Sequence, residues 1–102
     1  MQLAKVRGTV VSTHKARSMQ GVKLLLVQYI DESGELLPKY EVAADIVGAG
    51  VNEWVLISRG SAARIEERFD TRPLDATIVG IIDTVSVDNR SLYSKKETER
   101  FS

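Results

Sequence analysis

The chain has 102 residues, with 14 basic and 14 acidic side chains, one histidine and no cysteine. A chain of this length is most simply one domain with a small hydrophobic core. The balanced charge argues against broad binding to nucleic acid or an anionic membrane, and the lack of cysteine excludes disulfides and thiolate metal sites. Because His14 is the only imidazole, we expect neither a histidine metal cluster nor a Ser-His-Asp triad.

Targeting signals are not evident either. The first residues lack a signal-peptide pattern, and no apolar run is long enough to span a bilayer. Together with the missing cysteines, these features predict a protein of the reducing cytoplasm.

Five segments have the composition of β-strands, because they are rich in Val, Ile, Leu and Thr and are bounded by turn residues. We expect the strands at residues 3–13, 22–30, 37–44, 51–58 and 77–87. Gly8 inside the first segment predicts a bulge or a sharp bend. Asp-Glu-Ser-Gly at 31–34 predicts a hairpin between the second and third segments. A short helix is expected over 61–68.

The strand predicted at 22–30 is apolar on both faces, with Leu24 and Leu26 on one and Leu25 and Val27 on the other. An antiparallel strand with one solvated face alternates more cleanly. A small barrel buries only its inner face, and one short helix covers little of the outer face. Contiguous apolar surface usually marks an interface, so the pattern predicts a five-stranded OB-like barrel that forms an oligomer of unspecified order.

Two turns rich in small residues flank the strand predicted at 51–58, which carries the only tryptophan, Trp54. The first turn contains Gly48, Ala49 and Gly50, and the second contains Gly60, Ser61, Ala62, Ala63 and Arg64. Small residues suit tight bends where another backbone comes close. No hydroxyl, thiol, imidazole and carboxylate are grouped there in a way that suggests bond chemistry. We therefore interpret the stretch as an assembly element.

Several separated motifs occur in an order that is typical of one protein family. They are residues 3–6, 8–13, 21–27, 45–64, 72–76 and 79–83. With them the chain resembles the EutN/CcmL family of bacterial microcompartment shell proteins, and most closely its carboxysome vertex members. The resemblance extends to about Tyr93, and the chain departs from the family pattern at 14–20, at 65–69 and after Ser94.

The resemblance implies an all-β, five-stranded OB-like barrel with one short helix, assembled as a cyclic homopentamer. It places this domain at 1–93 and a polar tail at 94–102. It implies a structural protein without catalytic residues, metal or cofactor, whose pentamers cap the vertices of the polyhedral carboxysome shell in the cytoplasm. Hexameric carboxysome shell proteins and carboxysome scaffold proteins are the implied partners, with RuBisCO and carbonic anhydrase as the cargo. The two small-residue turns then lie at the subunit interface or the five-fold axis.

Each feature also has a plainer interpretation. Gly48-Ala49-Gly50 could cradle a phosphate, but it precedes a strand, whereas a dinucleotide fingerprint precedes a helix, so a tight structural turn is the favoured interpretation. Gly60 and Ser61 could simply start a helix. Asp83 on an apolar strand is more often a hydrogen-bonded or ion-paired carboxylate than a catalytic one, since no second catalytic group accompanies it. Trp54 is more often part of a core than a ligand platform.

Other functional classes stay open at this point. One is the vertex protein of a different microcompartment, and another is a small enzyme, which the absent catalytic constellation disfavours. A third is an OB-type nucleic-acid binder. Its support is the basic N-terminal quarter, namely Lys5, Arg7, Lys15, Arg17 and Lys23. Such a binder usually interleaves exposed aromatic and basic residues, and this chain has few aromatics.

Overall fold

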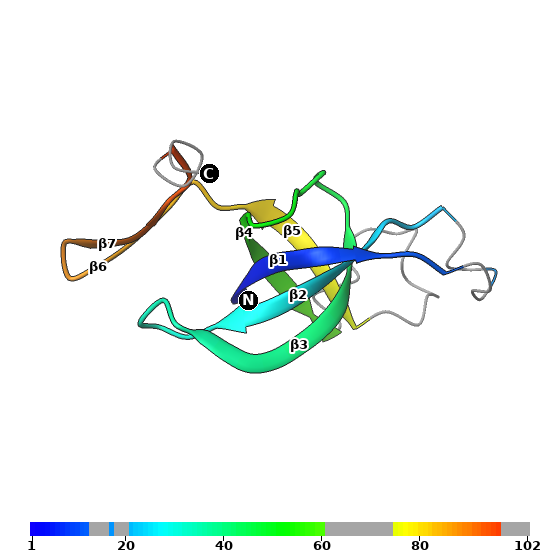
Figure 1. The fold of residues 1–102 in the computed structure, drawn as a ribbon, viewed down its shortest axis with the longest axis horizontal. Coiled ribbons are helices and arrows are strands. Elements are labelled where there is room, and N and C mark those ends of the chain that lie inside the picture. The colour runs from blue at the N-terminus through cyan, green and yellow to red at the C-terminus, as the bar shows by residue number, and fades with distance from the viewer. Residues whose placement is uncertain (13–16, 18–20, 61–74, 97–102) are drawn as a thin grey trace.

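A computed structural model describes residues 1–12, 17, 21–60 and 75–96, and its centre is a closed β-barrel (Figure 1). The barrel strands are paired in the order β1-β2-β3-β5-β4, and β6 and β7 form a separate two-stranded sheet. The strands are β1 (Gln2–Val10), β2 (Leu24–Ile30), β3 (Leu36–Asp45), β4 (Trp54–Arg59), β5 (Ala76–Ile81), β6 (Thr84–Val87) and β7 (Arg90–Ser94). The predicted five-stranded barrel is thus confirmed, while the helix predicted at 61–68 lies outside the described residues.

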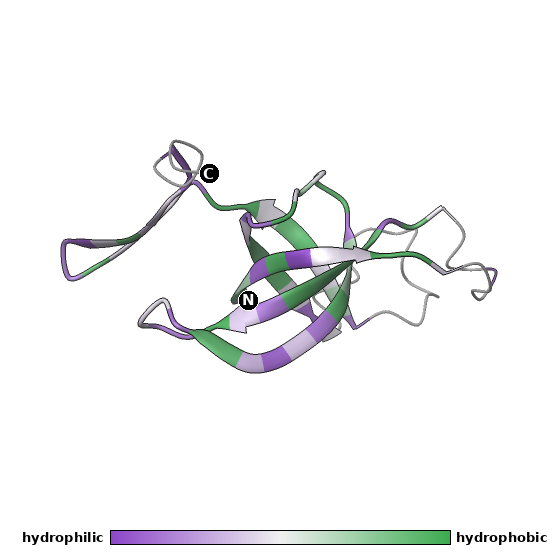
Figure 2. Ribbon diagram, viewed as in Figure 1, coloured by the Kyte–Doolittle hydropathy of each residue, from purple (hydrophilic) through white to green (hydrophobic). Residues whose placement is uncertain are grey.

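The interior of the barrel is filled by alternate residues of each strand. On β2 these are Leu25, Val27 and Tyr29, each at most 2% exposed. They pack with Ala4 and Val6 of β1, and the rest of the cluster comes from the other three barrel strands and the loop after β3. Successive side chains of a strand point to opposite faces, so this set leaves the other β2 residues on the outside. Figure 2 shows hydrophobic residues concentrated in the first half of β2 and in β5.

β1 contains a bulge and pairs with two different neighbours, one on each edge. The β1–β2 register shifts between Val6 and Gly8, where the sequence predicted a bulge or a bend. Residues Gln2 to Lys5, before the bulge, also pair with β4 on the other edge of β1. Bulges increase the local twist and bend of a strand, which a barrel of few strands needs in order to close.

The last predicted strand is the main correction to the sequence interpretation. Residues 77–87 form two strands rather than one, because the chain leaves the barrel at Ile82 and Asp83 and starts again at Thr84. β6 and β7 are joined by Asp88 and Asn89, which have φ angles of 50° and 63°. Positive φ at both loop residues is the geometry of a type I′ hairpin turn. A two-residue loop of Asp and Asn between strand-like residues was the signal available in the sequence.

The C-terminal hairpin covers part of the outer surface of the barrel. Tyr93 of β7 stacks on Trp54 of β4, with ring centroids 4.4 Å apart and an interplanar angle of 14°. Both rings belong to a buried cluster with Ile30 and Ile82. Outer apolar residues of β2 and β4 are therefore buried within one chain at this end of the barrel. That accounts for part of the two-faced pattern from which the sequence argument inferred an oligomer.

Candidate functional site

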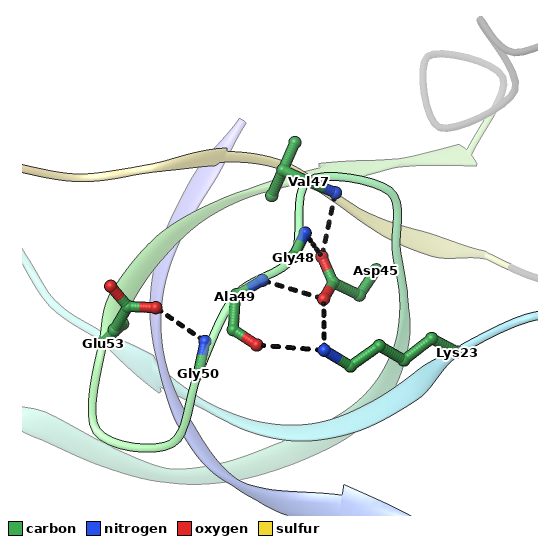
Figure 3. Close-up of polar contacts among 7 residues, drawn as sticks. All are labelled: Lys23, Asp45, Val47, Gly48, Ala49, Gly50 and Glu53. Atoms are coloured by element: carbon green, nitrogen blue, oxygen red, sulfur yellow. Dashed lines mark hydrogen bonds and ion pairs between the residues drawn. The ribbon is translucent and has the colours of Figure 1, made fainter.

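The loop between β3 and β4 is organised by the carboxylate of Asp45, whose side chain is 0% exposed. Its Oδ1 accepts the backbone N–H groups of Val47 and Gly48, both at 3.0 Å, and its Oδ2 accepts that of Ala49 at 2.9 Å (Figure 3). The Lys23 ammonium of the segment before β2 lies 3.2 Å from Oδ2 and also donates to the carbonyl of Ala49. A buried charge requires such pairing and hydrogen bonding.

A second carboxylate holds the other half of the loop. Glu53 accepts the backbone N–H of Gly50 at 2.6 Å, and its other oxygen lies 2.7 Å from the Lys95 ammonium, just after β7. The bond with Lys95 is the main cause that lowers the pKa of Glu53. The loop also joins β1, because Asn52 N–H donates to the carbonyl of Val6 and Val6 N–H donates to that of Glu53. Glu53 thus connects the loop to the C-terminal hairpin.

Left-handed backbone at two positions explains the residue types of this loop. Gly48 has a φ of 81° and Asn52 a φ of 75°. Glycine adopts this region without a steric penalty, and asparagine is among the side chains that tolerate it best. The strand that was predicted to begin at residue 51 therefore begins only at Trp54, as β4.

The hydrogen bonds decide what the glycine loop can do chemically. A phosphate-binding loop needs free backbone N–H groups that converge on the anion. Here the N–H groups of residues 47–50 donate to the chain's own carboxylates. The loop is therefore a structural turn with its donors already occupied, as the plainer sequence interpretation held.

A second polar cluster spans the gap between β3 and β5, and we call it the Arg59 seam. Its members are Tyr29, Glu41, Arg59 and Asp75. Arg59, the last residue of β4, donates to the Tyr29 hydroxyl at 2.9 Å, to Glu41, and to Asp75 at 2.7 Å. The Tyr29 hydroxyl in turn donates to Glu41. Side chains therefore connect two strands whose backbones pair only at one end.

Burial of Tyr29 is the first cause that raises the pKa of its phenol, to about 12, and its bond to Glu41 raises it further. The same hydroxyl is the main cause that raises the pKa of Arg59. At neutral pH the Tyr29 phenol is therefore neutral, and its hydroxyl lies between Arg59 and Glu41. A phenol held neutral in this way is not available as a general base at neutral pH.

The two small-residue turns singled out in the sequence lie apart. Gly48 to Gly50 precede β4 and Gly60 follows it, so the turns flank opposite ends of a six-residue strand. Gly60 has a φ of 61°, and its N–H donates to the carbonyl of Asp75. The remaining candidates, Ser61, Ala62, Ala63 and Arg64, lie outside the described residues.

The described residues contain few other side chains that could bind a metal ion or take part in catalysis. They contain no group of three or more side chains that could hold a metal ion. Asp83 is exposed at the point where the chain leaves the barrel. No helix among them is both long and apolar enough to cross a bilayer.

Comparisons with known proteins place this barrel in a family. Residues 1–83 match the family profile described as ethanolamine utilisation protein EutN/carboxysome. The carboxysome shell vertex protein CcmL of Gloeobacter violaceus is 66% identical over 100 residues, which are 98% of this chain and 100% of that protein. The chain belongs to the EutN/CcmL family.

Solved structures of the EutN/CcmL family share the fold. That of Gloeobacter violaceus CcmL superposes with a TM-score of 0.89 at 68% identity, covering 94% of this chain and 99% of that one. The GrpN pentameric microcompartment shell protein from Rhodospirillum rubrum gives a TM-score of 0.76 at 45% identity, over 85% and 99% of the two chains. The family profile ends at residue 83, before β6, whereas the CcmL match includes the hairpin.

Proposed function

We propose that this chain is a structural shell protein that forms a cyclic homopentamer and caps the vertices of a polyhedral carboxysome. The observation that carries the proposal is the 66% identity to a carboxysome shell vertex protein over 98% of this chain and 100% of that protein. The lower identity of 45% to the shell protein GrpN makes the vertex of another microcompartment the second candidate. The hydrogen-bonded loop and the ion-paired seam agree with a structural role rather than an enzymatic one.

The geometry of a closed shell explains why such a protein is needed. Hexameric tiles form flat sheets, and closing a sheet of hexagons into a polyhedron requires five-fold tiles at the corners. A ring of five identical copies uses a heterologous interface, in which two different surfaces of the chain meet and the rotation closes. Hexameric shell proteins and scaffold proteins are the partners that this role implies, and the compartment lies in the cytoplasm.

Solution mass and a complementation experiment test the proposal together. We expect a pentamer mass by light scattering at micromolar concentration. We also expect closed polyhedral carboxysomes when the chain is produced in cells that lack their own carboxysome vertex protein. A monomer or dimer would contradict the pentamer. A pentamer that leaves the shells open would favour the vertex of a different microcompartment.

The small-residue turns give the proposal a second test. We place Gly48, Ala49, Gly50, Gly60, Ser61, Ala62, Ala63 and Arg64 at the subunit interface or the five-fold axis. Ala62→Trp should then obstruct the close approach of neighbours, since overpacking costs about 1–3 kcal/mol per site and the ring repeats it. The expected result is native circular dichroism with loss of the pentamer mass. An unchanged mass would remove Ala62 from the interface.

A further inference from the structure

A pocket lies between β7 and the outer face of the barrel, close to the point where the hairpin leaves β5 (Figure 1). Its volume is about 340 Å³. The side chains that matter for its chemistry are Lys5 of β1, Asn52 of the loop before β4, Trp54 of β4, and Ser91 and Tyr93 of β7. Ligand pockets in proteins usually measure about 300–1,000 Å³, so a small molecule fits in this one.

Lys5 supplies the charge of the pocket. Ala4 and Val6 point into the barrel core, so Lys5 between them points outward. Its neighbours across the two adjacent strands are Gln28 and Trp54, which are both uncharged. The ion pairs found in the described part of the chain do not include Lys5. Its ammonium group is therefore available for an anion.

The carboxylate next to the pocket along the chain does not neutralise this charge. Glu53 follows Asn52, but one of its oxygens accepts the N–H of Gly50 and the other lies 2.7 Å from the ammonium of Lys95. Glu53 and Lys95 thus offset each other. Among the described residues that line the pocket there is no acidic side chain, so the pocket keeps the positive charge of Lys5.

Hydrogen-bond donors accompany this cation. The exposed Asn52 side chain carries two N–H donors on its amide. The Ser91 hydroxyl donates to the carbonyl of Tyr93 at 3.4 Å, whereas hydroxyl donors usually lie about 2.5–3.0 Å from their acceptor. A ligand oxygen can replace so long a bond at little cost. An ammonium, an amide and a hydroxyl together are donors suited to an oxyanion.

One side of the pocket is aromatic. Trp54 and Tyr93 stack with ring centroids 4.4 Å apart, and both belong to a buried cluster. These rings are held in place by packing, so they form a fixed apolar wall beside the polar donors. Small-molecule sites typically combine such an apolar wall with a few polar groups that set the orientation of the ligand.

We propose that this pocket binds a small phosphate monoester, with its phosphate on Lys5 and Asn52 and its organic part along Trp54 and Tyr93. A phosphate carries more negative charge at neutral pH than a carboxylate and has three acceptor oxygens, which suits three kinds of donor. The pocket is built within one chain, so the proposal does not depend on the ring of five copies.

Calorimetry on the wild-type protein in its native assembly tests the proposal with phenyl phosphate as the probe. We expect one site per chain. Inorganic phosphate should bind more weakly because it lacks the part that contacts the aromatic wall, and phenol should not bind. Absence of phenyl phosphate binding would overturn the proposal, and so would equal binding of phenol. Equal binding of benzoate would overturn the assignment to phosphate, and equal binding of inorganic phosphate would overturn the placement of the organic part.

Substitution of Lys5 tests whether this residue holds the phosphate. Lys5→Gln should weaken phenyl phosphate binding by about tenfold or more, because it removes a charge-assisted contact. Lys5→Arg keeps the charge and should retain most of the binding. Lys39→Gln is the matched control, since Lys39 is an exposed lysine that lies over the Tyr29 ring, outside the pocket. An equal loss in the Lys39 variant, or no loss in the Lys5→Gln variant, would overturn the proposal.

Chemical labelling of the native protein gives a readout that needs no variant. Acetylation of lysine side chains, followed by mass spectrometry, should be slower at Lys5 when phenyl phosphate is bound and unchanged at Lys39. This measurement carries the test if Lys5→Gln unfolds. Equal rates at Lys5 with and without saturating phenyl phosphate would overturn the proposal. The vertex function proposed above would stand in that case, because its own test is the pentamer mass.

Discussion

Two ion-paired clusters include a carboxylate of β3, Asp45 at its end and Glu41 in its middle, and they differ in how deeply they are buried. In the loop after β3, Asp45 is fully buried and takes three backbone N–H groups and a lysine. In the Arg59 seam the charged side chains are partly exposed, 34% for Arg59 and 60% for Asp75. Ion pairs in water contribute little to stability, whereas a buried charge that loses its partners is costly. Burial, rather than the number of charged contacts, should therefore decide which cluster the fold depends on.

The largest effect is expected at Asp45. Asp45→Ala leaves three backbone N–H groups of the loop without an acceptor and removes the partner of Lys23. We expect a loss of about 3–5 kcal/mol in the free energy of unfolding by urea denaturation. Asp45→Asn is the matched control and should lose less, because its amide oxygen still accepts. A loss below about 1 kcal/mol for the alanine variant would show that water replaces the carboxylate.

Arg59→Met should have an intermediate effect, because it removes three hydrogen bonds from partly exposed partners. A loss of about 1–3 kcal/mol in the free energy of unfolding is expected, since Glu41 and Tyr29 keep only each other. Glu41→Gln is the control for the electrostatics of the seam. It removes the carboxylate that raises the pKa of Tyr29, so ultraviolet titration should find that pKa below about 12. An unchanged titration would show that burial alone sets the value.

The Glu53–Lys95 pair should produce a dependence of stability on pH. The folded pKa of Glu53 is lowered, chiefly by Lys95, so the folded state binds its proton less readily than the unfolded chain does. The stabilisation is complete above the unfolded pKa and is lost as the pH falls through the lowered folded value. In the Lys95→Met variant the free energy of unfolding should fall less steeply as the pH is lowered into the acid range, because Glu53 has lost the partner that lowers its pKa. At neutral pH the variant should be less stable by about 1 kcal/mol. The double variant Glu53→Gln with Lys95→Met should lose little more stability than either single variant does, because each single change already breaks the pair.

Asp75→Asn should have the smallest effect of the series. Its carboxylate is 60% exposed, and solvent replaces much of its attraction for Arg59. The expected loss is below about 1 kcal/mol in the free energy of unfolding, and it should shrink further at high salt. A loss as large as that of Arg59→Met would mean that the exposed Arg59–Asp75 pair contributes as much stability as the contacts of Arg59 with Tyr29 and Glu41.

The barrel could be predicted from the sequence because its strands repeat a local pattern. Runs rich in Val, Leu and Thr in β1 and β2, turn residues at 31–34 and Gly8 at the bulge are properties of short segments. The hairpin β6–β7 could not be separated from β5, because Val and Ile recur throughout residues 77–87 and a single Asp does not by itself end a strand. The break at Asp83 depends on contacts with Trp54 and Lys95, which are distant in sequence.

The candidate site was predictable only in part. Small residues at 48–50 indicated a tight turn correctly, and Gly48 has the left-handed backbone expected of such a position. The acceptor that organises the turn, Asp45, was not singled out, although an aspartate two to four residues before a glycine turn is a common arrangement. Arg59 was missed as well, because its partners come from β2, β3 and the residue before β5.

Because Trp54 of the barrel stacks on Tyr93 of the hairpin, tryptophan fluorescence reports whether the hairpin is packed on the barrel. The chain has one tryptophan, so its whole indole emission comes from a ring that is 9% exposed and lies against a phenol 4.4 Å away. Lifting the hairpin would bring water to that ring and shift its emission to longer wavelengths, while the rest of the barrel contributes no indole signal. Spectroscopy on the unlabelled protein can thus follow the hairpin separately from the circular dichroism of the barrel.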